Sequence, residues 1–148
     1  MTRIAFRDWI FDCAVDATRT AYQGITAGGV EECNCDGCLN FLCQRQTAFP
    51  SEVMNFFRLV GVDYRRDAEF YHVARADSGL HLYEGWFHFI GSIVQQPDGP
   101  AKIDDRFTID FLPGRSLAAK TFGDQPLVQV EVTASIPWML TGVPEPMS

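Results

Sequence analysis

The apolar residues of this chain change their spacing near Glu69, and this change limits the folds open to it. Before that point Val53, Phe56, Phe57 and Val60 recur at the three- and four-residue spacing of a helix face. After it, apolar and polar residues alternate as they do in strands. The segregation predicts a single α+β domain, with two or three helices in the N-terminal half packed on a largely antiparallel sheet formed mainly by the C-terminal half.

The same patterns predict the individual elements. Short polar segments rich in glycine or proline separate them. In chain order we expect a strand over residues 4–15 covered on both faces, a short helix capped by Asp16 or Thr18, a helix beginning near Gly37, a helix after Pro50 that stops at Gly61, and strands over residues 70–75, 80–94, 107–111 and 128–136.

The length of 148 residues fits one domain, and a hydrophobic content of 47% is enough to build a sizeable core. We place the domain at residues 1–143. The tail over residues 144–148 contains two prolines and is expected to be loose.

Charge and hydropathy exclude several partner classes. The net charge is −7, and the longest basic run, Arg65-Arg66, is followed at once by Asp67. Binding to nucleic acid needs clustered Lys and Arg side chains, so no nucleic-acid partner is expected. No apolar run approaches the length of a membrane span, which predicts a cytoplasmic protein without a membrane partner. The aromatic segment over residues 83–89 leaves a protein partner or a homodimer open.

Four of the five cysteines fall within eleven residues, at positions 33, 35, 38 and 43. Cys33 and Cys35, two apart in extended chain, point the same way. Cys35 and Cys38 form a C-x-x-C turn, which lets two sulfurs converge on one ion about 2.3 Å from each. In a reducing compartment such thiols favour metal, redox or packing roles over a disulfide framework. If these thiols hold a metal, zinc is the candidate.

Cys43 is a poor fourth ligand for these three thiols, because it lies about 140° around the helix from Cys38. Packing is the interpretation for Cys43 and for Cys13. A tetrahedral site then needs a fourth ligand from His72, His81, His88, an acidic group or Cys43.

Among these candidates we name His88 as the fourth ligand. His88 shares the alternating positions of Leu82, Trp86 and Ile90 along the predicted strand, so it falls on their apolar face, as a core histidine would. Both roles, metal ligand and core residue, therefore stay open. His81 directly follows the predicted turn and is expected to be exposed.

No recognised catalytic motif is present, so no catalytic residue is assigned. The sequence favours a protein that is not an enzyme, without deciding the question. The first hypothesis is a non-enzymatic binding or accessory protein whose cysteine loop is structural. A zinc-type domain using Cys33, Cys35 and Cys38 is the second. The third is a thiol oxidoreductase using Cys35 and Cys38, although Asp36 between these thiols and the lack of a βαβ context oppose it.

Several segments together carry a family resemblance. They include Cys33-x-Cys35-x-x-Cys38-x-Asn40-Phe41, residues 49–63, residues 81–91 with the pattern H-L-Y-x-G-W-F-H-F, and Ile136-Pro137-Trp138. With these motifs the chain resembles a family of small uncharacterised bacterial and phage-associated proteins. The resemblance implies no activity; it implies that the cysteine segment and the strand around Trp86 and His88 belong to one shared module.

Overall fold

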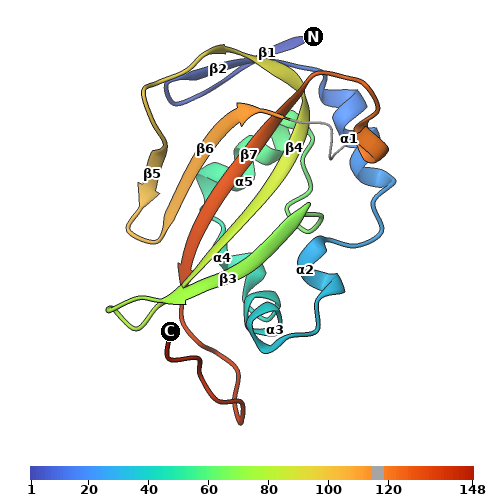
Figure 1. The fold of residues 1–148 in the computed structure, drawn as a ribbon. Coiled ribbons are helices and arrows are strands. Elements are labelled where there is room, and N and C mark those ends of the chain that lie inside the picture. The colour runs from blue at the N-terminus through green and yellow to red at the C-terminus, as the bar shows by residue number, and fades with distance from the viewer. Residues whose placement is uncertain (115–118) are drawn as a thin grey trace.

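A computed structural model describes residues 1–114 and 119–148, and in these residues seven strands form one sheet (Figure 1). The strand order is β1-β2-β4-β7-β6-β5, with β3 paired to β4 beside β2. The strands are β1 (Thr2–Phe6), β2 (Trp9–Cys13), β3 (Glu69–Arg75), β4 (His81–Gln95), β5 (Ala101–Asp104), β6 (Phe107–Pro113) and β7 (Leu127–Ile136).

Strand β4 is the longest element and lies inside the sheet, where it pairs with other strands along both of its edges. Along one edge it pairs with β7 from His81 to Ile90. Along the other edge it pairs first with β3, up to Trp86, and then with β2, from Gly91 onward. Every strand pair is antiparallel, and most strands come from the second half of the chain. The predicted α+β architecture is confirmed.

The helices are α1 (Val15–Gln23), α2 (Gly29–Glu32), α3 (Asp36–Leu42), α4 (Arg45–Ala48), α5 (Ser51–Val60) and α6 (Ala119–Phe122). None of the helices in the described part of the chain is long and apolar enough to cross a membrane.

Helix α5 lies against the middle of the sheet (Figure 1), and the apolar stripe read from the sequence is buried. The ring of Phe57 lies 4.9 Å from that of Phe87 in β4, and the ring of Phe56 lies 5.4 Å from that of Phe111 in β6. Gly61 ends the helix in the left-handed region, at φ 90°, as predicted. The core is therefore an aromatic layer between α5 and the sheet.

The N-terminal segment differs from the single strand expected over residues 4–15. It forms a hairpin, β1 and β2, joined at Arg7 and Asp8, with Arg7 at φ 49°. β1 buries Ile4 and Phe6, and β2 buries Trp9 and alternate residues after it. The two-residue turn changes the parity of the buried positions, so apolar residues of both parities point to the same face of the hairpin.

The expected cap of the first helix is corrected. Ala14, not Asp16 or Thr18, precedes α1 and makes no side-chain cap. The Thr18 hydroxyl instead donates to Ala14 O at 2.8 Å and accepts from Ile90 N at 2.9 Å, which ties α1 to β4. No sequence pattern indicated α2, α4, β5 or α6, because four residues are too few to show a period.

The β2–β4 pairing predicts that Gly91→Ala is strongly destabilising. Gly91 opposes Cys13, and a Cβ on Gly91 would overlap the backbone carbonyl of Asp12, which cannot move without breaking the pairing. We expect a loss of about 3 kcal/mol in the free energy of unfolding, measured by urea denaturation. The control, Gly99→Ala, has no atom near the added methyl and should change stability by less than about 0.5 kcal/mol. Equal stabilities of the two variants would contradict the register.

Candidate metal centre

The cysteine segment connects two short helices below the sheet. After α2 ends, Cys33 is extended, and Cys35, also extended, forms the N-cap of α3. The Cys35 sulfur accepts a hydrogen bond from the backbone N–H of Cys38 at 3.4 Å. An extended stretch followed by one helical turn thus brings the three thiols together, and the predicted helix start near Gly37 is confirmed.

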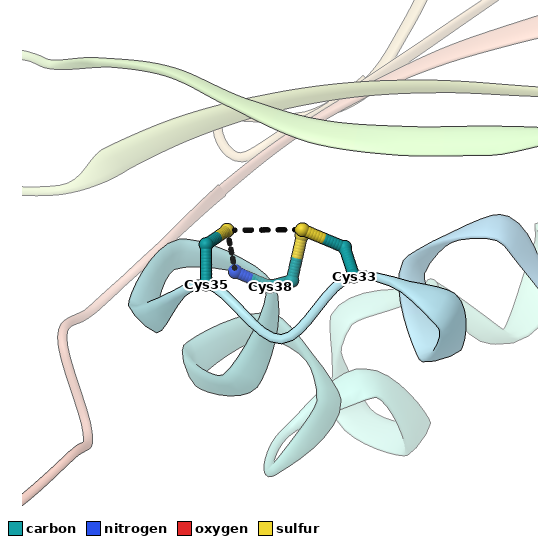
Figure 2. A group of neighbouring side chains, drawn as sticks. All are labelled: Cys33, Cys35 and Cys38. Carbon is teal, nitrogen blue, oxygen red and sulfur yellow. Dashed lines mark hydrogen bonds between the residues drawn. The ribbon is translucent and has the colours of Figure 1, made fainter.

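The ligand atoms of Cys33, Cys35 and Cys38 all lie within 4.8 Å of one another. Figure 2 shows the three sulfurs on one side of the loop, facing the strand that passes over it. The sulfurs of Cys33 and Cys35 are 3.3 Å apart. A disulfide bond is about 2.05 Å long, whereas sulfurs that share a tetrahedral zinc are about 3.8 Å apart. The spacing is close to that needed around a shared ion.

Burial and acidity differ among the three thiols. Cys38 is buried, Cys33 is half-buried and Cys35 is exposed, so the cluster opens to solvent on one side. Hydrogen bonds to the Cys33 sulfur, first from the backbone of Cys35 and then from the neighbouring thiols, lower the pKa of Cys33. Burial raises the pKa of Cys38, and its neighbouring sulfurs raise it further. A bound cation would supply the charge that Cys38 needs to ionise.

The other two cysteines lie outside this group. Cys13 is buried in β2, as predicted, and burial raises its pKa to about 12. Cys43 is exposed, and its thiol donates to Asn40 O at 3.1 Å. The prediction that Cys43 packs in the core is wrong, because α3 turns that position toward solvent; its exclusion from the ligand group agrees with the helical phase.

Hydrogen bonds fix the cysteine turn to the sheet. The hydroxyl of Tyr83, in β4, donates to Gly37 O at 2.6 Å. The fully buried Asn40 donates to Tyr83 Oη at 3.3 Å and to Pro137 O at 3.1 Å, and accepts from Met139 N at 2.7 Å. Asn40 had no structural role assigned from the sequence, where its only signal was a polar residue beside Phe41 in the cysteine motif.

His88, the fourth ligand named from the sequence, lies away from the cysteines. It is buried, with Nε2 at 3.3 Å from Gln129 Oε1 and its ring 5.9 Å from that of Phe122. Its position in β4 has the opposite parity to Tyr83, so it faces away from the cysteine turn. Burial lowers the pKa of His88. These surroundings are those of a core histidine, and the structure does not bring His88 to the three cysteines.

The other two histidines form a hydrogen-bonded chain that leads to the C-terminal tail. His72 Nε2 lies 2.8 Å from His81 Nδ1, and His81 Nε2 lies 2.7 Å from Glu145 Oε1. Arg75 donates to the same carboxylate oxygen at 3.1 Å. Hydrogen bonds from His81 and then Arg75 lower the pKa of Glu145, and burial, followed by the charge on His81, lowers that of His72.

These hydrogen bonds correct the expectation for His81. It was expected to be exposed, but it is fully buried, because the ring of Trp138 and the carboxylate of Glu145 pack against it. The tail over residues 144–148 has no helix or strand, and Glu145 contacts β3 and β4 from it. Sequence alternation could not show this, since the contact joins positions 64 residues apart.

A buried carboxylate supports the start of the cysteine segment. Asp67 Oδ2 accepts from Val30 N at 3.1 Å, and Asp67 O accepts from Gly29 N at 3.0 Å, which holds α2 beside β3. Within the described residues, Asp67 Oδ1 is buried without a hydrogen-bond partner. Burial raises the pKa of Asp67 to about 6.

The raised pKa of Asp67 predicts a pH dependence of stability. Between pH 3.8 and about 6 the folded protein keeps a proton that the unfolded chain releases, so the contribution of this group to stability falls as pH rises through that window. Asp67→Asn should remove up to about 3 kcal/mol of this dependence, measured as urea unfolding free energies at pH 4 and pH 7. Asp98→Asn, in an exposed loop, is the control. Parallel wild-type and Asp67→Asn profiles would overturn the prediction.

Comparisons of the chain with protein-family models, with curated proteins and with solved structures found no match. The function of the protein is therefore inferred from the geometry of this site.

Proposed function

We propose that the protein binds a zinc-type metal ion through Cys33, Cys35 and Cys38, and that the ion stabilises the loop between α2 and α3. The observation that carries the proposal is the convergence of three sulfur ligand atoms within 4.8 Å of one another. Thiolate ligands favour zinc, copper(I) and iron–sulfur centres over hard cations such as magnesium or calcium. The protein then acts as a binding or accessory protein whose cysteine loop is structural.

The surroundings support a metal better than a reactive dithiol. A thiol oxidoreductase using Cys35 and Cys38 needs an attacking thiol of lowered pKa. Burial, followed by the neighbouring sulfurs, raises the pKa of Cys38, which opposes its use as the attacking thiol. Three thiols of unlike burial that share one space suit a common cation, which would stabilise all three as thiolates.

The proposal predicts stoichiometric metal in protein purified without an affinity tag and without added metal. We expect about one equivalent of zinc per chain by elemental analysis, because structural thiolate sites bind zinc tightly at neutral pH. Cys35→Ser should weaken zinc binding by about a hundredfold or more in a competition assay with a chromophoric chelator. Serine at an N-cap still accepts the N–H bond of Cys38, so this variant keeps the start of α3.

Cys43→Ser is the matched control. Cys43 is exposed at the opposite end of α3 from Cys35 and lies outside the sulfur group, so its loss should leave zinc affinity unchanged. Wild-type protein with less than about a tenth of an equivalent of zinc or iron, and no binding on titration with zinc, would reject the metal site. A Cys35–Cys38 disulfide formed reversibly in a glutathione buffer by such metal-free protein would favour the oxidoreductase instead.

A further inference from the structure

Three thiolates leave one position of a tetrahedral site open, and His72 lies beside them. Strand β3 passes over the start of α3, so that a Cβ placed on Gly37 would be 3.1 Å from His72 Cβ and 3.7 Å from His72 Cγ. Gly37 lies between Cys35 and Cys38 in the chain. His72 also opposes Tyr83, whose hydroxyl holds Gly37, so the histidine and the cysteine turn are attached to the same place on the sheet.

The hydrogen-bonded chain sets the tautomer of the His72 ring. The carboxylate of Glu145 can only accept, so His81 Nε2 carries a proton. With both rings neutral, His81 Nδ1 is then a bare acceptor, and His72 Nε2 must carry the proton that the two nitrogens share. This leaves the lone pair of His72 on Nδ1. Among the described residues, Nδ1 of His72 has no hydrogen-bond partner, and the side chain is only half-buried.

We infer that His72 Nδ1 is the fourth ligand of the metal, in a site of three thiolates and one imidazole, with His81 and Glu145 as positioning residues. The inference rests on the proposed function. A metal-bound histidine commonly donates its other N–H to a carboxylate or to a group that leads to one, and such partners fix the ring and strengthen the ligand. The chain from His72 through His81 to Glu145 has this form.

A small movement completes the site. The ring nitrogens of His72 lie outside the group whose ligand atoms are all within 4.8 Å of one another. Cys35 is exposed and Cys33 half-buried, so their loop can close toward β3 around an ion while Cys38 stays in place. His81 and Glu145 hold the His72 ring from its far side during this closure.

X-ray absorption at the zinc edge tests the ligand set in the full-length protein loaded with one equivalent of zinc. We expect three sulfur neighbours and one nitrogen neighbour, with the outer scattering typical of an imidazole. His72→Gln should abolish the imidazole scattering and weaken zinc binding by at least about tenfold. Glu145→Gln should keep the imidazole scattering and weaken binding by about tenfold, within the range seen for outer partners of ligands.

His88→Gln is the matched control, since His88 lies in the neighbouring strand and faces away from the cysteines; neither measurement should change. Wild-type protein that takes up no zinc defeats the proposed function itself. Wild-type protein that binds zinc without imidazole scattering, or a His72→Gln variant of unchanged affinity or unchanged scattering, defeats only the inference about His72. The wild-type spectrum decides the ligand set even if a variant folds poorly.

Discussion

Strand β4 is hydrogen-bonded along both edges over most of its length, and the candidate site depends on this pairing. Its start carries His81 and Tyr83, which contact the C-terminal tail and the cysteine turn. Its end pairs with the N-terminal hairpin and binds α1 through Thr18. Because β7 fixes the register of β4 through ten successive pairs, the positions of His81 and Tyr83 relative to each other are rigid.

That rigidity explains how a short, polar loop can hold ordered thiols. The loop between α2 and α3 has little apolar surface of its own, so it is fixed by hydrogen bonds at its ends. Asp67 holds α2 at one end, and Tyr83 with Asn40 holds α3 at the other. Between these anchors only Cys33 and Cys35 are free to move toward a ligand, which suits a site that closes around an ion.

Sequence periodicity predicted the long elements well, because helix α5 and strands β3, β4, β6 and β7 each show a clear repeat. It failed at the N-terminal hairpin, where a two-residue turn inverts parity, and for elements of four residues. In the site, spacing identified Cys33, Cys35 and Cys38 and excluded Cys43. Of the three histidines it named His88, which faces away from the cysteines, since parity gives the face of a strand and not what lies above it. The burial of His81 depends on Glu145, which no local pattern connects to it.

The contacts around α3 also set the order in which the site forms during folding. Asn40 accepts a hydrogen bond from the N–H of Met139, a residue 99 positions later. Glu145, which contacts His81, lies further along the chain still. Contacts between distant residues form slowly, because a long loop must close before they contribute free energy. The three thiols are near one another in the chain and can come together early in folding. The groups that bury and orient their surroundings lie far along the chain and join them last. Until the tail docks, Asn40 lacks its partner at Met139, so the cysteine turn is less firmly fixed to the sheet than in the folded protein.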